Sequence, residues 1–469
     1  MNQPRACSIA VDELVRITGG RFIGRARTVD FRGACIDSRR VTPACLFACL
    51  VGRHVDGHDY AAAAVGNGAA LVLASRPVEV PVGVLQCPDV TTALGRIAAW
   101  FRNRYQAAEW VGITGSNGKT TVKEMLRAAL AARGAVHATA GNLNNELGVP
   151  LSVLATPAGM RSVIIEMGAS AQGEIDRLAA IVQPDVGVLT GIGPAHLEGF
   201  GGLMGVARGK TELLWHCRRC AWVSLCGLDA VAVAHGVEAD AIRARVHEAA
   251  GSLPLHLLTE EDCLARIRAG DPPRLLQEDG AELPLGMSGT HNAWNALLAL
   301  HVAEELDVPA ADAAAAVAAV EPVSGRLRSI DLGVHRLFDD SYNANPASMA
   351  AGLAVLSCQA GARLAVLGGM GELGPSSDRL HRQVGAEAAR LGLPLITVGA
   401  GGAAIATGYR DAGGRDLAET ADKEAALELI DERLAVGPTA ILVKASRSAA
   451  LDEIIAALQA AHGETGECG

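Results

Sequence analysis

The sequence predicts an α/β protein with about three domains. The chain has 469 residues, and at roughly 150 residues per domain this length accommodates three domains. Short apolar runs of strand type alternate with amphipathic helical stretches, which is the pattern of parallel sheets covered by helices. No internal repeat, low-complexity tail or long charged run interrupts this alternation.

Four strand-like runs in the middle of the chain predict one parallel sheet. They are residues 110–114, 163–167, 186–190 and 221–225. After the first run, apolar residues recur at helical spacing over 120–133, and Gly134 follows as a C-terminal cap. We expect this sheet to form a central domain over residues 89–321.

A second α/β unit is predicted downstream. Strand-like runs at 337–340, 364–367, 395–398 and 441–444 are separated by helical stretches. Glu321-Pro-Val-Ser-Gly325 breaks an Ala-rich helical region, which places a boundary near residue 322. We therefore expect three domains over 1–88, 89–321 and 322–469.

Composition excludes several classes of protein. Hydrophobic residues make up 50% of the chain and aromatic residues 3%, and the formal net charge is -10. Nucleic-acid binding favours stacking aromatics and a basic face, so we expect no nucleic-acid partner. Apolar runs such as 69–74 fall far short of the roughly 20 residues that span a membrane. The N-terminal segment carries the charged residues Arg5, Asp12 and Glu13, which interrupt the continuous apolar stretch that a signal peptide needs. We therefore expect a cytoplasmic protein.

The 11 cysteines are scattered along a long chain, which favours free thiols over a disulfide framework. Cys217 and Cys220 have C-x-x-C spacing with His216 beside them, but no second pair completes a zinc site. A metal or redox role for this pair is the less favoured alternative.

The segment Trp110-Val-Gly-Ile-Thr-Gly-Ser-Asn-Gly-Lys-Thr-Thr121 predicts a strand, a turn and a helix that together bind phosphate. In such a loop, backbone N–H groups and the helix N-terminus favour anions, a lysine reaches the terminal phosphates and a hydroxyl ligates magnesium. The predicted nucleotide-binding residues are Gly115, Ser116, Asn117, Gly118, Lys119, Thr120 and Thr121. Ile113 stands where the usual phosphate-loop pattern has its first glycine, so the prediction depends on the strand-turn-helix context.

A nucleoside triphosphate brings Mg²⁺, and its ligands should follow neighbouring strands. Glu166 ends the second strand-like run of the middle segment and is the first predicted ligand. His196 lies in a glycine-rich loop after the third run, where a surface role and a role at the nucleotide are evenly matched.

Together, Thr114-Gly-Ser-Asn-Gly-Lys-Thr120, Glu166, Gly193-Pro-Ala-His196-Leu-Glu198 and Lys210 resemble the Mur ligase family. The resemblance implies a UDP-substrate domain, a central ATPase domain and a C-terminal Rossmann-like domain. It also implies ATP, two Mg²⁺ ions and a carbamylated Lys210. A carbamate turns a cationic amine into an anion suited to hard cations. Thr120 and Glu166 would hold one ion, and His196 and Lys210 the other.

Further motifs carry the same resemblance into the last third of the chain. Gly289-Thr-His-Asn-Ala-Trp-Asn295 implies that Asn295 faces adenine, and Arg326 matches an arginine that reaches the γ-phosphate. The stretch Asp339-Asp-Ser-Tyr-Asn-Ala-Asn-Pro-Ala-Ser-Met349 resembles the branch of the family that adds D-alanyl-D-alanine. It implies that Asp340 contacts the ribose and that Asn343 and Asn345 lie near the nucleotide.

Three other segments agree with this resemblance. Gly141-Asn-Leu-Asn-Asn-Glu-Leu-Gly-Val-Pro150 implies substrate contacts for Asn142, Asn144 and Asn145. Ile36-Asp-Ser-Arg39, together with Asp56-Gly-His-Asp59, resembles the UDP-substrate domain and assigns Ser38 and Arg39 to the UDP-sugar. Leu442-Val-Lys-Ala-Ser-Arg447 resembles a C-terminal motif of the same branch.

The chain also departs from the family pattern. Gly369 stands where the family often has aspartate, Ala445 where it has glycine, and the loop 168–173 lacks an Asn-His-Pro sequence. The first change creates a G-x-G-x-x-G pattern over 369–374, but no acidic residue follows the next strand-like run, which argues against a dinucleotide site.

The resemblance implies a ligase with Lys119, His196, Lys210 and Arg326 as catalytic residues. Its substrates would be ATP, UDP-N-acetylmuramoyl-tripeptide and D-alanyl-D-alanine, and an acyl phosphate would be the intermediate. We expect a monomer. A sister ligase that adds one amino acid, and a nucleotide-binding switch without ligase activity, are the alternatives.

Overall fold

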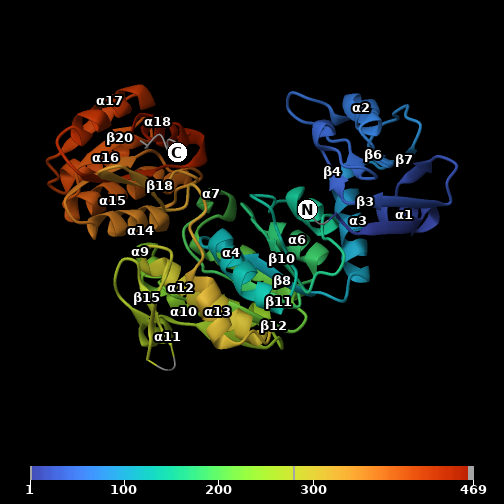
Figure 1. The fold of residues 1–469 in the computed structure, drawn as a ribbon, viewed down its shortest axis with the longest axis horizontal. Coiled ribbons are helices and arrows are strands. Elements are labelled where there is room, and N and C mark those ends of the chain that lie inside the picture. The colour runs from blue at the N-terminus through green and yellow to red at the C-terminus, as the bar shows by residue number, and fades with distance from the viewer. Residues whose placement is uncertain (1–2, 278–279, 463–469) are drawn as a thin grey trace, which may run out of the picture.

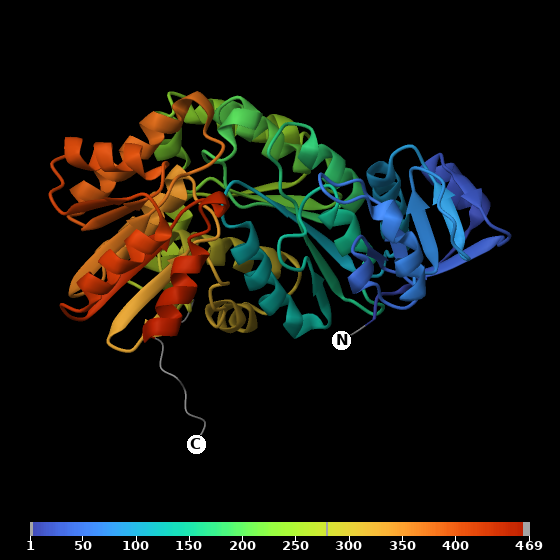
Figure 2. The same cartoon turned by 90° about the horizontal axis from the view of Figure 1, so that it is seen from above.

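The computed structural model describes residues 3–277 and 280–462. The chain forms three sheet-containing parts in a row, with the first and last at opposite ends of an elongated molecule (Figures 1 and 2). The predicted α/β class is confirmed. No helix among the described residues is long and apolar enough to cross a membrane.

The first part has a five-stranded sheet of order β2-β7-β6-β5-β4 and a separate antiparallel pair, β1 with β3. In the larger sheet only β2 runs antiparallel to its neighbour. Its elements are β1 (Ala6–Ala10), α1 (Val11–Thr18), β2 (Arg21–Ile23), β3 (Thr28–Arg32), β4 (Ala34–Cys35), β5 (Leu46–Ala48), α2 (Ala61–Gly66), β6 (Leu71–Ala74), β7 (Gly83–Gln86) and α3 (Val90–Arg104).

The central part has a six-stranded, fully parallel sheet of order β13-β12-β11-β8-β10-β9. All four predicted runs are strands of this sheet, so that prediction is confirmed. The strands are β8 (Glu109–Thr114), β9 (Val136–Ala138), β10 (Ser162–Glu166), β11 (Val186–Leu189), β12 (Cys220–Ser224) and β13 (Leu255–Leu258). Buried side chains on both faces explain their apolar sequences.

Helices cover both faces of the central sheet, and a small antiparallel sheet of β14, β15 and β16 follows it. The helices are α4 (Lys119–Leu130), α5 (Gly148–Leu154), α6 (Glu174–Val182), α7 (Leu197–Phe200), α8 (Leu203–Thr211), α9 (Leu228–Ala234), α10 (Ala239–Ala250), α11 (Glu260–Arg266), α12 (Thr290–Glu305) and α13 (Ala310–Ala318). The small strands are β14 (Ile267–Arg268), β15 (Arg274–Leu276) and β16 (Glu282–Pro284).

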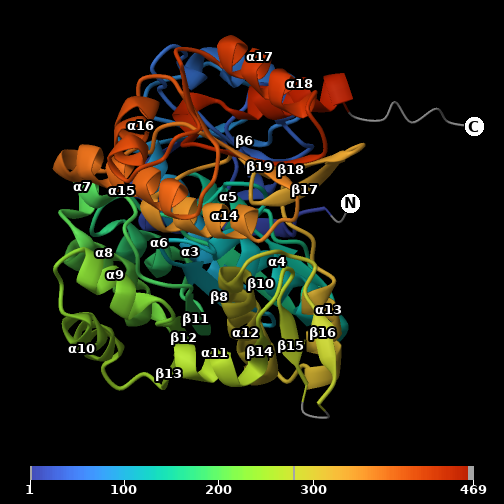
Figure 3. The same cartoon turned by 90° about the vertical axis from the view of Figure 1, so that its left-hand side faces the viewer.

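The last part has a six-stranded sheet of order β17-β18-β22-β19-β20-β21, in which only β17 is antiparallel. Its strands are β17 (Arg328–Leu332), β18 (His335–Asp340), β19 (Ala362–Leu367), β20 (Leu395–Val398), β21 (Leu417–Thr420) and β22 (Thr439–Lys444). Its helices are α14 (Pro346–Ser357), α15 (Ser377–Arg390), α16 (Gly402–Asp411), α17 (Lys423–Leu434) and α18 (Asp452–His462). Residues 463–469 lie outside the described residues. Seen from its end, this part sits over the central helices, with α14 and α15 nearest to them (Figure 3).

Candidate active site

One cavity of about 1450 Å³ lies between the central and last parts. The loops that follow β8, β10 and β11 line its central wall, as expected at the carboxyl ends of a parallel sheet. The segments after β18 and β22, together with the loop after β19, line the opposite wall. Residues far apart in the sequence therefore face one space.

The loop between β8 and α4 depends on glycine at two positions, Gly115 and Gly118. Gly118 precedes α4 with a φ of 81°, a conformation that glycine adopts without strain. A Cβ atom on Gly115 would lie 2.1 Å from the Thr190 hydroxyl, and one on Gly118 would lie 2.5 Å from Asn295 Oδ1. Both positions need glycine because neighbouring side chains come so close.

Lys119 is the first residue of α4, and its Nζ donates to the carbonyl of Gly115 at 2.7 Å and that of Ser116 at 3.3 Å. Burial lowers the pKa of Lys119 to about 8, the charge of Glu166 opposes that shift, and Arg326 adds to it. The ammonium therefore lies against the loop carbonyls at the N-terminus of a helix, a position that favours a phosphate anion.

Glu166 ends β10 and is buried at the centre of a polar cluster. Its carboxylate accepts hydrogen bonds from Thr120 Oγ1 at 3.0 Å and from Asn144 Nδ2 at 2.8 Å. Lys123 Nζ lies 3.8 Å from the same carboxylate, and its ammonium donates to the Thr139 carbonyl. Thr120 and Glu166, the two residues predicted to hold one magnesium ion, therefore lie in direct contact, and the side-chain amide of Asn144 joins them.

His196, which precedes α7, contacts the carboxylate of Glu372 from the last part through its Nδ1. Burial lowers the pKa of His196, and Glu372 opposes that effect. Neutral imidazole is the form that ligates metals.

Lys210, on α8, is almost fully buried at 1% exposure, and its Nζ donates to the Ala169 carbonyl at 2.9 Å and lies 5.0 Å from the centre of the Phe200 ring. Among the described residues no carboxylate lies within ion-pair distance of this ammonium, and burial lowers its pKa well below the usual value. Lys210 does not itself line the cavity, but Ala169, whose carbonyl accepts its hydrogen bond, does.

The last part contributes a cation and a buried ion pair. The Arg326 guanidinium lies 4.5 Å from the Tyr342 ring centre and faces the cavity. Asp340 is 2.7 Å from Lys444 Nζ, which also donates to the Asn343 carbonyl at 2.9 Å. Burial raises the pKa of Asp340, and Lys444 opposes that shift.

The helix α12 presents its first turns to the cavity. Asn295 Nδ2 donates to Asn292 Oδ1 at 3.3 Å, and Asn292 in turn donates to the Ser288 carbonyl. Burial lowers the pKa of His291 to about 4, so this imidazole is neutral at physiological pH. The amide of Asn295 is therefore held in place beside the phosphate loop.

Lys123 and Glu372 are charged residues that line the cavity but are not among the predicted site residues. Lys123 lies four residues after Lys119, one helical turn along the same face of α4, and this spacing is the signal that identifies it. Glu372 lies in the stretch 368–374, which resembles a family motif, but no sequence signal pairs it with His196, because only the fold brings the two together. A second contact joins the same two walls, since Asn345 Nδ2 donates to Asn117 Oδ1 at 2.6 Å.

Asn142, Asn144 and Asn145 all line the cavity, but Asn145 Oδ1 accepts from the backbone N–H groups of Leu147 and Gly148 and so holds the turn that leads into α5. Ser38 and Arg39 do not line it. Arg39 donates two hydrogen bonds to Asp37, at 3.0 and 2.9 Å, and holds the pKa of that carboxyl at about 2.

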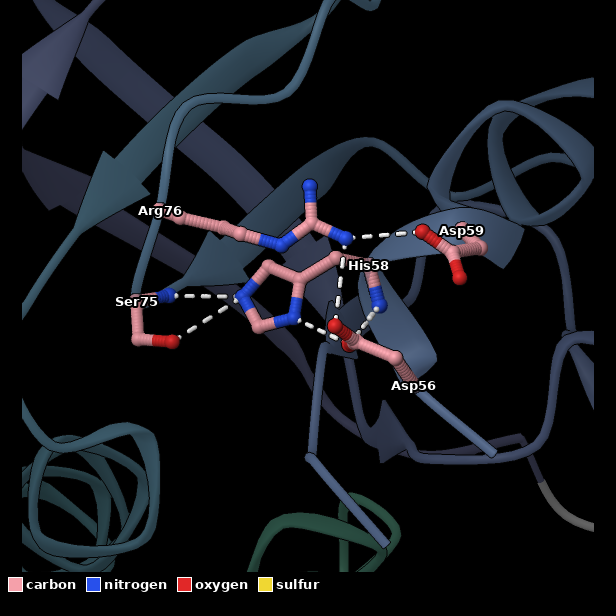
Figure 4. Close-up of polar contacts among 5 residues, drawn as sticks. All are labelled: Asp56, His58, Asp59, Ser75 and Arg76. Carbon is pink, nitrogen blue, oxygen red and sulfur yellow. Dashed lines mark hydrogen bonds and ion pairs between the residues drawn. The ribbon is translucent and has the colours of Figure 1, made fainter. Parts of the chain in front are cut away.

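A Ser-His-Asp arrangement in the first part of the chain is structural. His58 Nδ1 lies 2.6 Å from Asp56, and its Nε2 lies 3.1 Å from Ser75 Oγ (Figure 4). The backbone N–H of Ser75 also donates to Nε2, at 2.9 Å, and the imidazole is fully buried. This N–H occupies the Nε2 lone pair of a buried ring, so the imidazole is not free to act as a base. The cluster instead fixes the loop between β5 and β6, together with Arg76 and Asp59.

Comparisons with known proteins agree with this geometry. Three family descriptions match: "Mur ligase middle domain" over residues 113–303, "Mur ligase, glutamate ligase domain" over 325–447 and "Mur ligase family, catalytic domain" over 30–130. A UDP-N-acetylmuramoyl-tripeptide–D-alanyl-D-alanine ligase of Escherichia coli is 34% identical over 98% of this chain and 100% of its own. The chain belongs to the Mur ligase family.

Other Mur ligases are also similar. The same ligase of Bacillus subtilis is 31% identical over 90% of this chain and 92% of its own length. Among solved structures, MurF from Acinetobacter baumannii matches with a TM-score of 0.82, 29% identity and coverage of 97% of this chain and 99% of that one. MurF from Thermotoga maritima in complex with ADP matches with a TM-score of 0.76, 25% identity and coverage of 92% and 97%.

The departures of this Mur ligase from the family pattern lie in close backbone contacts. A Cβ atom on Gly369 would lie 2.9 Å from the Cα of Gly401. Ala445 is fully buried after β22. The glycine-rich pattern over 369–374 therefore packs against its own chain at Gly369 and presents Glu372 to His196, an arrangement unlike a dinucleotide cradle.

Proposed function

We propose that this chain is an ATP-dependent ligase that joins D-alanyl-D-alanine to the terminal carboxylate of UDP-N-acetylmuramoyl-tripeptide. The product is UDP-N-acetylmuramoyl-pentapeptide, a peptidoglycan precursor. The observation that carries the proposal is one cavity that collects Lys119, Glu166 and Arg326 from both walls. Full-length similarity to ligases named for this reaction supports the choice of substrates.

The reaction proceeds in two displacements. A carboxylate oxygen of the tripeptide attacks the γ-phosphorus of ATP, the bond to the β-phosphate oxygen breaks and ADP leaves. The amine of D-alanyl-D-alanine then attacks the carbonyl carbon of the acyl phosphate, phosphate leaves and the amine loses a proton. Lys119 and Arg326 place positive charge around the transferring phosphoryl oxygens, where negative charge spreads in the transition state.

The residues beside the phosphate loop fit Mg²⁺. Thr120 and Glu166 offer hard oxygen donors 3.0 Å apart, and such donors suit this ion. When bound, Mg²⁺ neutralises phosphate charge and orients the transferring group. Asn144 and Lys123 hold the Glu166 carboxylate in position from two sides.

Lys210 is proposed to be carbamylated. Its amine is buried without a carboxylate partner at ion-pair distance among the described residues, and burial favours the neutral form that attacks carbon dioxide. The bond from nitrogen to carbon forms and one amine proton is lost. With His196, the resulting carbamate would offer anionic oxygens to a second Mg²⁺.

We assign the remaining residues to substrates. Gly115, Ser116, Asn117, Gly118 and Thr121 cradle the ATP phosphates, Asn295 faces adenine, Asp340 faces the ribose, and Asn343 lies near the nucleotide. Asn142, Asn144 and Asn145 lie toward the tripeptide, and Ser38 with Arg39 binds the UDP-sugar. A UDP-linked substrate is long, which fits a uridine site on the first part and a reacting carboxylate at the central cavity.

We further propose domain boundaries near residues 88 and 322, each between two of the three sheet-containing parts. The chain would act as a monomer in the cytoplasm, where ATP and UDP-linked precursors are present.

The test is phosphate release from ATP with UDP-N-acetylmuramoyl-tripeptide, comparing D-alanyl-D-alanine with single amino acids as acceptors. Release should require both the tripeptide and the dipeptide and should be lost in Lys119→Ala. Lys423→Ala is the matched control, since Lys423 pairs with Glu453 on the surface of the last part. Release with single amino acids would identify a sister ligase instead. Slow hydrolysis that no acceptor alters would indicate a nucleotide switch and would refute the proposal.

A further inference from the structure

Three side chains outside the active site form a compact set of metal-binding groups. Cys220 of β12, His256 of β13 and Glu305, the last residue of α12, each offer one ligand atom, and these atoms lie within 4.8 Å of one another. We propose that they bind a transition-metal ion of the Zn²⁺ class. This site is independent of the proposed ligase reaction.

The fold itself brings the three groups together. β12 and β13 are parallel neighbours in which Trp222 pairs with His256, so Cys220, two residues before Trp222, shares its face of the sheet with His256. The helix α12 packs on this face, where Cys220 and the apolar side of α12 belong to one core cluster. Cys217, the C-x-x-C partner of Cys220, instead points to Leu213 and Gly187. Cys217 is therefore not a member of this set of three groups.

The imidazole of His256 is held for ligation by stacking alone. Its ring lies 4.5 Å from the Trp222 ring at an interplanar angle of 16°, and His301 stacks on the same indole at 5.0 Å. Within residues 3–277 and 280–462, neither ring nitrogen of His256 has a hydrogen-bond or ion-pair partner. An oriented ring with its nitrogens unused is a ready ligand.

The donor set selects the metal. Thiolate, imidazole and one carboxylate suit Zn²⁺, whereas Mg²⁺ takes oxygen ligands. Tetrahedral Zn²⁺ would need ligand atoms about 3.3–3.6 Å apart, so the side chains close by about 1 Å on binding. A water completes the four ligands. The metal–sulfur bond forms as the Cys220 thiol releases its proton to solvent.

Charge around the site is compatible with a cation. Glu305 ends α12, where helix carbonyls carry partial negative charge. Arg219 lies 3.7 Å from the Glu305 carboxylate and hydrogen-bonds to the Cys220 side chain, but it also lies 3.8 Å from Glu109 and is partly exposed. A bound metal ion would therefore displace Arg219 from Cys220 and Glu305, and Arg219 can keep its ion pair with Glu109.

The experiment uses Co²⁺ as a coloured substitute for Zn²⁺ on the full chain after chelator treatment, with excess Mg²⁺ to fill the oxygen-lined active site. We expect a single Co²⁺ with a thiolate-to-cobalt charge-transfer band that Zn²⁺ removes. Cys220→Ser should abolish the band. His256→Ala and Glu305→Gln should each weaken binding by about 100-fold or more, since loss of even an outer partner of a ligand costs about 10–100-fold.

The matched control is Cys226→Ser with Cys263→Ser, because these thiols lie 3.3 Å apart at another place and are the main competing thiol site. The band should persist in this double variant. Loss of the band there, its persistence in Cys220→Ser, or its absence from the wild type would each overturn the proposal. If Cys220→Ser does not fold, the two affinity changes in His256→Ala and Glu305→Gln decide the question, and unchanged affinity in both refutes it.

Discussion

Replacing Lys444 with methionine should destabilise the last part of the chain through its buried ion pair. Lys444 is 1% exposed and lies 2.7 Å from Asp340, whose side chain is 14% exposed. Methionine preserves most of the side-chain volume but leaves this carboxylate without its cation. Removal of one partner of a buried pair costs about 3–5 kcal/mol. At about 3 °C per kcal/mol for a unit of this size, the melting temperature should fall by roughly 9–15 °C.

The effect should depend on pH. Burial already raises the pKa of Asp340, and Lys444 opposes that shift, so Lys444→Met raises this pKa further. A carboxyl whose folded pKa lies above its unfolded value of about 3.9 contributes most to stability below that value. Its contribution is lost as the pH rises through the folded pKa. The melting temperature of the variant should therefore be closest to that of wild type near pH 4 and furthest below it near neutral pH.

The assay is thermal unfolding of wild type, Lys444→Met, Asp340→Asn and the double variant across this pH range. The double variant should be more stable than Lys444→Met at neutral pH because it buries no unpaired charge. Lys423→Met, which breaks an ion pair on the surface, should cost less than about 1 kcal/mol. Equal melting temperatures for Lys444→Met and Lys423→Met, or a deficit that does not change with pH, would refute this reasoning.

Two other substitutions test the active site. Gly118→Ala should weaken ADP binding by about 10-fold or more in calorimetry, because a left-handed residue with a side chain costs about 1–2 kcal/mol and its Cβ would lie 2.5 Å from Asn295. The control is Gly141→Ala, where φ is 54° and a Cβ would meet nothing within 4 Å, so this variant has the backbone strain without the collision. An equal loss of ADP affinity in both variants would contradict the role of the collision. Lys123→Met should lower the melting temperature in the absence of Mg²⁺, and added Mg²⁺ should restore part of the loss, since the ion replaces the cation beside Glu166. If Mg²⁺ leaves the difference in melting temperature from wild type unchanged, Lys123 and the ion do not share this position.

The central sheet could be predicted because its inner strands are buried on both faces and so appear as continuous apolar runs. The short edge strands β9 and β13 could not. β9 has three residues of intermediate burial, and β13 has only one fully buried residue. The strand β21, Leu-Ala-Glu-Thr, has no buried residue at all. Such strands depend on pairing with a neighbour, which leaves little pattern in the local sequence.

The same distinction holds for the active site. Lys119 and Thr120 follow one strand within a single local motif, and Glu166 ends the strand beside it, so sequence alone could place all three. The contact between His196 and Glu372 spans 176 residues and depends on how the last part sits against the central part. Nothing in the local sequence around Glu372 encodes that placement. The Cys220, His256 and Glu305 cluster is likewise a product of strand pairing and helix packing.

The contacts between the two walls have a consequence for how substrates bind. Asn117 and His196 lie on the central wall, and each contacts a residue of the last part, Asn345 and Glu372 respectively. Both are also residues that we assign to phosphate or metal. A substrate or ion that engages them must therefore keep, replace or break the contacts that join the walls. The free energy of binding then differs between the arrangement in which the two walls are in contact and the arrangement in which they are apart. This difference couples binding at the site to the arrangement of the domains.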